Sequence, residues 1–479
     1  MVDKKTETVE NTIARLKRIA MKGIRKHDVE LVLEAIAACA KIEYFWNQRY
    51  SDYEIEGLLK GVSSQLTQHF YVPDKNTVLF YDEPGYDLRA LGTIYLKSLA
   101  EAGYKVICVT RDEAKGKQPI QDKAISGFDV HKVYYNFKGP YSSQLNKLVE
   151  VVLEYKPAYI IVHSNAFDPV WPVAFSLFKN IPTRYLVNLT DHGFWIGKDF
   201  IDYVLEFRDY GASISAQYRK INKEKLIKLP YYPYIDKQIP FKGLPLNDED
   251  KFFFSGGNLK KTLGEDNLYY DIVKEILTKN PNVHFLYAGM GDTSRIEKLQ
   301  SVFSNRVVFI NERDDLYQIM CRCVFYLNTY PVIGGLMTQY AAACGKVPLT
   351  LSHGNRTEGL LLDDNDPCFF TDKEALIKDA CRLLTDDTYL NNRSNYIHNL
   401  VVDPSLFSDE LKKALETKAT KFEFKLMHVE SDVVHEEHKY AFDLNDVRRS
   451  IARINHKKLI RFFPILFIKR KLLAFQGKM

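Results

Sequence analysis

Residues 327–351 read LNTYPVIGGLMTQYAAACGKVPLTL. The pattern predicts a strand over 324–328, a tight loop that ends in Gly334 and Gly335, a helix from about Leu336 to Cys344 and a second strand over 347–351. Adjacent glycines let the backbone turn sharply and let a ligand approach it closely. The first turn of the helix offers unpaired N–H groups and the positive end of the helix dipole. The stretch therefore predicts a phosphate-binding loop, and a plain strand-to-helix turn is the alternative.

The same alternation of strand and helix extends on both sides of this loop. Continuously apolar segments such as TVLFYD (77–82) alternate with helical segments from residue 75 onwards, and after a linker rich in Pro and Tyr the alternation begins again at FFFSGG (252–257). Buried strands separated by helices are typical of a parallel sheet that is covered on both faces. We therefore expect an α/β fold with two Rossmann-like, doubly wound domains, and a ligand cleft beyond the carboxyl ends of their strands.

The chain divides into four predicted regions. They are a helical N-terminal extension (1–72), an N-terminal Rossmann-like domain (73–240), a C-terminal Rossmann-like domain (241–400) and a C-terminal helical tail (401–479) that is basic and amphipathic from about residue 447. In the extension, apolar residues recur at helical spacing and Asp28 is a predicted helix N-cap. No chemistry is evident there, so we expect a packing role or a homo-oligomer contact for these helices.

Composition restricts the class of protein. The 479 residues are 46% hydrophobic and 27% charged, which is typical of a globular protein of two or three domains. No run of about 18 apolar residues is present, the N-terminus is polar, and the seven cysteines are scattered. These features favour a reducing, cytoplasmic location.

Basic residues are concentrated at the C-terminal end. Residues 447–479 contain ten Lys or Arg and no Asp or Glu, so that the other 446 residues carry a net charge of −5 although the whole chain carries +5. This asymmetry argues against a general nucleic-acid surface. Apolar residues alternate with the ten cations, which is the composition of a helix that lies in a membrane interface. We expect 447–479 to bind an anionic membrane surface, and a terminal helix docked on the N-terminal helices is the alternative.

Three segments of the second half carry a family resemblance. FFFSGGNLKK (252–261), FLYAGMGD (285–292) and RVVFINERDD (306–315), followed by the Gly334–Gly335 loop, resemble the GT-B glycosyltransferases, and the resemblance covers about residues 76–400. It implies a first domain that binds the acceptor, a second domain that binds a nucleotide-sugar donor, and no metal or other cofactor. It also implies that the glycine loop receives the diphosphate and that the loop after VVFI meets the nucleobase.

The resemblance assigns a donor site residue by residue. Gly334, Gly335, Leu336 and Met337 would offer backbone N–H groups to the diphosphate, Thr338 would add a hydroxyl, and Asn311, Glu312 and Arg313 would flank the nucleobase. The expected donor site also includes Gly256, Gly257 and Gln339. Many retaining relatives have two glutamates around this loop, whereas this chain has Val332 and Gln339, so the stereochemistry stays open.

Two lysines and two histidines are the candidates for charge and proton transfer. Lys260 and Lys261 follow the glycine pair where a diphosphate needs positive charge, and a solvated surface pair is the alternative. His192 follows Asp191 at the end of an apolar strand and precedes a predicted helix that contains Tyr203 and Val204. An imidazole beside a carboxylate can accept the proton of an attacking hydroxyl.

Other interpretations of these residues stay open. His192 is alternatively an ordinary loop residue beside a capping Asp191, and the neighbouring Phe194 and Trp195 are either a cover for a sugar ring or part of the core. His163, at the end of the strand AYIIVHS, is the second candidate base. The acidic run from Asp363 to Asp366 has oxygen ligands suited to a divalent cation, but we expect no metal there.

The sequence as a whole predicts a glycosyltransferase that is peripheral to the inner face of the cell membrane. It would move a sugar from a nucleotide-diphosphate donor, most simply a UDP-sugar, to a hydroxyl of a lipid-linked or growing glycan. A non-catalytic sugar-nucleotide-binding relative, or another GT-B enzyme such as a sugar-nucleotide epimerase, is the alternative.

Overall fold

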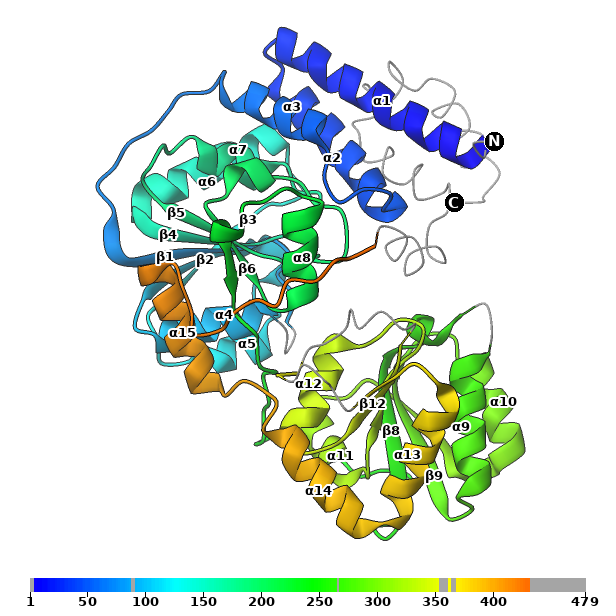
Figure 1. Cartoon of the computed structure of the whole chain (residues 1–479). Helices are drawn as coiled ribbons and strands as arrows, with labels where there is room; N and C mark the ends of the chain where they lie inside the picture. Colours follow the sequence, from blue (N-terminus) through cyan, green and yellow to red (C-terminus); the bar gives the residue numbers. More distant parts are fainter. Residues whose placement is uncertain (1–3, 88–90, 265–266, 353–360, 363–367, 431–479) are drawn as a thin grey trace. The chain divides into compact units, whose positions relative to one another are not determined.

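The computed structural model describes residues 4–87, 91–264, 267–352, 361–362 and 368–430. They form two compact units (Figure 1). Unit 1 contains the described residues up to 87, 95–228 and 411–430, and unit 2 contains 229–410 and the short segment 91–94. The basic tail (447–479) and the acidic run from Asp363 to Asp366 lie outside the described residues.

Unit 1 is built on a sheet of seven parallel strands in the order β3-β2-β1-β4-β5-β6-β7. The strands are β1 (Asp74–Asp82), β2 (Lys105–Arg111), β3 (Val130–Tyr135), β4 (Pro157–His163), β5 (Thr183–Val187), β6 (Tyr203–Glu206) and β7 (Leu226–Lys228). The strand order reverses between β1 and β4. Ligands of doubly wound sheets bind beyond the carboxyl ends of the strands at such a switch point.

Helices cover both faces of this sheet. They are α1 (Lys4–Arg25), α2 (Val29–Trp46), α3 (Tyr53–Ser63), α4 (Leu91–Glu101), α5 (Pro119–Ala124), α6 (Tyr141–Tyr155), α7 (Val170–Ser176) and α8 (Asp209–Gln217), with short 3-10 turns η1 (Asp112–Ala114), η2 (Lys198–Phe200) and η3 (Lys223–Lys225). Figure 1 shows α6 and α7 on one face and α4 and α5 on the other. The described N-terminal helices form a layer beyond α6 and α7, because α2 packs on α6 and α3 packs on α7.

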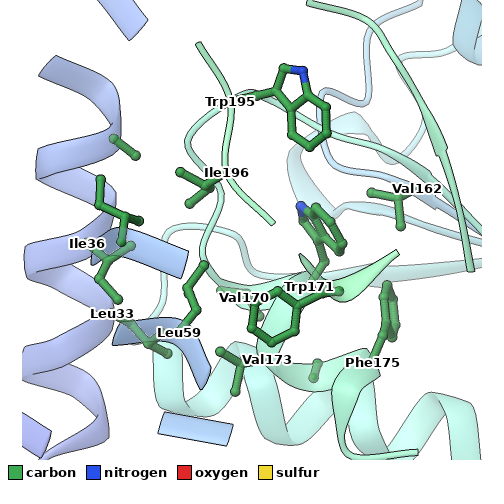
Figure 2. Close-up of a cluster of buried hydrophobic side chains, with 14 of the residues drawn as sticks. Leu33, Ile36, Leu59, Val162, Val170, Trp171, Val173, Phe175, Trp195 and Ile196 are labelled. Carbon is green, nitrogen blue, oxygen red and sulfur yellow. The ribbon is translucent and has the colours of Figure 1, made fainter. Parts of the chain in front are cut away.

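The core of unit 1 runs without a break from the N-terminal helices to the sheet. Figure 2 shows Leu59 of α3 next to Val170 and Val173 of α7, with Leu33 of α2 on one side of them and Val162 of β4 on the other, beyond Trp171. Within the N-terminal helices, Gly61 of α3 allows α1 to approach closely, since a Cβ there would lie 2.8 Å from Ile24 Cδ1. The N-terminal helices were expected to have a packing role or to form a homo-oligomer contact. Much of their apolar surface is buried within unit 1. The homo-oligomer contact stays a prediction.

The N-cap prediction for Asp28 is confirmed, whereas the helix predicted around Tyr203 is wrong. The Asp28 carboxylate accepts a hydrogen bond from the Leu31 N–H (3.0 Å) at the start of α2. Tyr203 and Val204 belong to strand β6, which pairs in parallel with β5 on one side and β7 on the other. Val204 is fully buried, and a short buried strand has the same apolar composition as one buried turn of helix.

Unit 2 contains a second parallel sheet in the order β10-β9-β8-β11-β12-β13. Its strands are β8 (Lys251–Asn258), β9 (Val283–Met290), β10 (Val307–Asn311), β11 (Tyr326–Leu327), β12 (Pro348–Leu351) and β13 (Phe369–Phe370). Its helices and 3-10 turns are η4 (Leu259–Thr262), α9 (Leu268–Lys279), α10 (Ser294–Phe303), η5 (Ser304–Arg306), α11 (Leu316–Arg322), α12 (Gly335–Ala343), α13 (Lys373–Thr385), α14 (Asp387–His398) and the first part of α15 (Pro404–Thr417).

The end of the described chain returns to unit 1. The Tyr185 hydroxyl of β5 donates to the backbone carbonyls of Ala414 and Leu415 in the second part of α15 (3.3 and 3.1 Å). The segment after α15 then follows α8, where the Met427 N–H donates to Ser213 Oγ (3.0 Å). The predicted class, an α/β chain with two Rossmann-like domains, is confirmed, and none of the described helices is long and apolar enough to cross a membrane.

Candidate functional site

The strand–loop–helix predicted from 327–351 is present, and Asn328 organises it. Helix α12 begins at Gly335, close to the predicted start. The Asn328 Oδ1 atom accepts hydrogen bonds from the Thr329 and Gly334 N–H groups (both 3.0 Å), and Asn328 Nδ2 donates to Thr338 Oγ1 (2.8 Å). One buried amide side chain therefore holds both ends of the glycine loop.

This arrangement changes which of the predicted groups point to a ligand. The Gly334 N–H is bonded to Asn328, and the Thr338 hydroxyl is buried, where it donates to the Gly334 carbonyl (3.3 Å). Gln339 is also buried. The N–H groups of Gly335, Leu336 and Met337 occupy the first turn of α12, where an α-helix has no internal acceptor, and no side chain caps this helix. Of the predicted diphosphate-binding groups, these three amides are therefore the ones without a hydrogen-bond partner among the described residues.

Lys261 lies against this loop. The Val332 N–H donates to the Lys261 carbonyl (3.2 Å), which ties the 3-10 turn η4 to the loop before α12. The Lys261 side chain is half-buried and has no carboxylate partner among the residues that the structure describes, and burial lowers the pKa of its ammonium group. Lys260 is exposed. A half-buried cation without a carboxylate partner among the described residues, on a turn that bonds this loop, is an electrostatic arrangement that an anion would complete.

The glycine pair before Lys261 allows two backbones to meet. Gly257 has a φ of +126°, and a Cβ on Gly289 of the neighbouring strand would lie 1.9 Å from the Gly257 carbonyl oxygen. Gly256 is buried in β8, and its carbonyl accepts from the Tyr326 hydroxyl (3.3 Å). The conformation of this pair thus follows from strand packing.

The residues predicted to flank a nucleobase lie at the end of β10. Asn311 and Glu312 are exposed. The Arg313 guanidinium donates to Asp315 Oδ1 (2.9 Å) and to the Gly243 carbonyl (2.7 Å), so it fastens the linker to unit 2. The Arg313 guanidinium is therefore already engaged by Asp315 and Gly243.

In unit 1, His163 lies at the switch point of the sheet. It ends β4 directly beside Asp82, the last residue of β1, and its Nδ1 lies 2.8 Å from Asp82 Oδ1. The imidazole side chain is 8% exposed and stacks on the Phe80 ring. The pair therefore occupies the position where the topology predicts a ligand, in a largely desolvated environment.

Two further acids at this point were not predicted from the sequence. Glu83 follows β1, and burial raises its pKa to about 7 although the Arg111 guanidinium pairs with it. Asp168 is buried and accepts from the Tyr81 hydroxyl (2.8 Å) and Ser164 Oγ (3.0 Å), and burial also raises its pKa. An acidic pair formed by the last residue of TVLFYD and the residue after it is the signal that could have identified Asp82 and Glu83.

Asp191 and His192 lie at the end of β5, and Arg208 holds the carboxylate. Asp191 Oδ1 lies 3.1 Å from His192 Nδ1, while Arg208 Nε and Nη2 donate to its two oxygens (2.5 and 2.9 Å). Burial alone would raise the pKa of Asp191, but the charge of Arg208 and the hydrogen bonds hold that pKa well below its usual range. The His192 side chain is 31% exposed, so a solvent-accessible imidazole lies beside an acid whose pKa is lowered.

Arg219, which was not a candidate from the sequence, also contacts the turn that carries Asp191 and His192. It is fully buried, and its Nη2 donates to the carbonyls of Thr190 (3.2 Å), Asp191 (2.9 Å) and Gly193 (2.6 Å). Its guanidinium also lies 5.1 Å from the centre of the Trp195 ring. Phe194 and Trp195 are buried, which favours the core interpretation of these aromatics. Arg219 thus sets the backbone turn that carries Asp191 and His192.

Arg208 and Arg219 pack against a buried acid network. Glu206 accepts from Asn188 Nδ2 (2.9 Å) and Ser215 Oγ (2.5 Å), and burial raises its pKa to about 7. Ser164, Asn188, Thr190 and Trp195 line a small cavity at this end of the sheet. Among the described residues, no group of three or more His, Cys, Asp or Glu side chains is arranged to hold a metal ion.

Comparisons with known proteins identify the fold. No family model matches the sequence, and no curated protein matches it. A point mutant of the Thermobaculum terrenum O-GlcNAc transferase has a TM-score of 0.50 at 15% identity, and the match covers 84% of this chain and 81% of that one. Anabaena HepE in complex with UDP-glucose has a TM-score of 0.51 at 14% identity, and covers 71% of this chain and 99% of its own.

A candidate UDP-N-acetylglucosamine 2-epimerase of Listeria monocytogenes is similar to the same extent. Its TM-score is 0.52 at 12% identity, and the match covers 74% of this chain and the whole of that one. Because the sequence identities are this low, the similarity shows only that the helices and strands are arranged in the same way. The chain has the two-domain, Rossmann-like GT-B fold that such glycosyltransferases and epimerases share.

Proposed function

We propose that the protein is a nucleotide-sugar-dependent glycosyltransferase that binds its donor diphosphate at the start of α12. The observation that carries the proposal is the first turn of α12, where the N–H groups of Gly335, Leu336 and Met337 have no intrahelical acceptor, together with the half-buried Lys261, whose backbone carbonyl bonds the preceding loop at Val332. The diphosphate oxygens would accept from these amides, and the Lys261 ammonium would neutralise part of their charge. Solved structures of the same fold include a complex with UDP-glucose, which supports a UDP-sugar as the donor.

We assign the proton transfer to His192. Arg208 keeps Asp191 ionised, and an ionised Asp191 favours the tautomer whose Nδ1 carries the proton. The Nε2 atom is then the acceptor for the proton of an attacking hydroxyl. His163, with Asp82, is the second candidate for this task. The acceptor we propose is a hydroxyl of a lipid-linked or growing glycan at an anionic membrane surface.

The function is tested by measuring product from a panel of UDP-sugars. With a membrane lipid extract present, one UDP-sugar should release UDP together with a glycosylated lipid, at a rate well above its slow hydrolysis without acceptor. The second candidate, a sugar-nucleotide epimerase, is favoured by the Listeria match. It would give an isomerised UDP-sugar without acceptor, which NMR of the nucleotide pool detects. If neither product forms but a UDP-sugar still binds, the protein is a non-catalytic relative.

The donor site predicts different effects for its two lysines. Lys261→Met should weaken UDP binding about tenfold or more, because a charge-assisted contact in a desolvated site is worth roughly 1.5–3 kcal/mol. Lys260→Met removes the same charge from an exposed position and should change the affinity by at most about threefold. Calorimetric titration with UDP measures both. Equal affinities for the two variants would move the diphosphate away from η4.

We also expect turnover without a divalent metal. The three amides at the start of α12 and the Lys261 ammonium supply fixed positive charge at the leaving diphosphate, so a chelator should leave the rate within about twofold. The measurement is the rate of UDP release with and without EDTA. A rate that requires added Mg²⁺ or Mn²⁺ would contradict this assignment and return attention to Asp363 and its neighbours.

A further inference from the structure

Helix α1 has a basic outer face that was not recognised from the sequence. Residues 11–27 contain six Lys or Arg and no Asp or Glu. Together with the ten cations of 447–479 this leaves the rest of the chain, which includes both sheets, with a net charge of −11. The positive charge of the protein is therefore concentrated in two short segments.

The cations of α1 lie together on one side of the helix. Arg15, Arg18, Lys22 and Arg25 are all exposed. At 3.6 residues per turn they fall within an arc of about 80°, along a helix length of about 15 Å. The nearby carboxylates are used elsewhere, because Asp52 and Glu54 bind Lys17 and Glu10 binds Arg49. Among the described residues, none forms an ion pair with Arg18, Lys22 or Arg25.

Tight packing fixes the direction of this face. The opposite side of α1 is apolar and buried, and it includes Ile13 and Leu16. Gly23 lies so close to α2 that a Cβ there would be 2.6 Å from Val32 Cγ2. Because the apolar side of α1 is already packed against the protein, that side cannot insert into the hydrocarbon of a membrane. The helix therefore presents its cations on a rigid surface. The only large apolar groups exposed around them in α1 and α3 are Met21 (46%) and Tyr53 (82%) among the described residues.

We propose that this face of α1 docks on an anionic membrane surface. A flat row of Lys and Arg on a rigid helix matches the charge of an anionic leaflet, and each such residue near the leaflet strengthens binding by about fivefold. A nucleic-acid groove is disfavoured, since the rest of the molecule is acidic. The inference does not depend on the donor site or on the tail.

The test compares two triple variants of the full chain by vesicle co-sedimentation. Arg18→Gln, Lys22→Gln and Arg25→Gln neutralise the α1 face, whereas Lys274→Gln, Lys298→Gln and Lys378→Gln remove the same charge from exposed helix positions of unit 2. With vesicles of phosphatidylcholine and phosphatidylserine, the α1 variant should lose about 30-fold or more of its partition coefficient, given about fivefold for each cation. The unit 2 variant should stay within about twofold of the wild type.

A charge-conserving variant and thermal unfolding serve as controls for the vesicle experiment. A variant with Arg18→Lys and Arg25→Lys should retain binding, since the charge is kept. Thermal unfolding should be similar in all variants, because the changed side chains are exposed. Equal partition of the two triple variants would overturn the proposal and leave any membrane contact to 447–479. If the α1 variant lost binding to a nucleic-acid duplex while its vesicle binding stayed unchanged, the membrane proposal would be overturned in favour of a nucleic-acid partner.

Discussion

Arg219→Met is expected to lower the free energy of unfolding by about 3–5 kcal/mol, the usual loss when a buried charge network loses one partner. The backbone carbonyls of Asp191 and Gly193 would lose their donor, while the Thr190 carbonyl would keep the Gly193 N–H, and each buried acceptor left unpaired costs roughly 1–3 kcal/mol. Glu206 would also lose a cation that offsets its burial. The measurement is chemical unfolding followed by circular dichroism.

Arg184→Met is the matched control for this change. Arg184 lies in the same sheet and forms a two-contact pair with Asp202 (2.9 and 3.0 Å), but both side chains are partly exposed. An exposed pair is worth at most about 1 kcal/mol. If the two variants unfold at the same denaturant concentration, Arg219 does not hold the turn as the hydrogen bonds indicate.

His192→Ala is expected to lower kcat by about 100-fold or more, which is the usual contribution of general acid–base catalysis. UDP affinity should stay nearly unchanged, because the proposed diphosphate site is formed by α12 and η4 of unit 2. A loss confined to kcat identifies a group that acts in the transition state. Steady-state rates with the best UDP-sugar, together with UDP titration, separate the two quantities.

Two further variants are compared with His192→Ala, one as a control and one as a test of the second candidate base. His131→Ala changes an exposed histidine on β3, at the opposite side of the sheet from β6, and should have no effect on turnover. His163→Ala tests the second dyad. If the His192 variant turns over at the wild-type rate while the His163 variant does not, the base is the switch-point histidine and Arg208 serves only the structure.

Local patterns were sufficient for most elements. The loop and helix from Gly334 were predictable because a glycine pair after a buried strand and before a run of small helix formers permits few other conformations. The N-cap at Asp28 was equally local. Strand β6 was mistaken for helix because three of its four residues are apolar and the segment is too short to show a period, so that only pairing with β5 and β7 distinguishes the two.

The sequence by itself determined the α/β class, the two doubly wound sheets, the glycine loop and the charge of the C-terminal segment, because each depends on residues close together in the chain. Tertiary structure decided which groups act together. Arg208 and Asp191 are 17 residues apart, His163 and Asp82 are 81 apart, and Lys261 meets the loop at Val332 only through packing of η4. Burial, which shifts the pKa values of Lys261 and Glu206, is likewise a property of the packed domain, because a side chain is removed from water only by the residues packed around it.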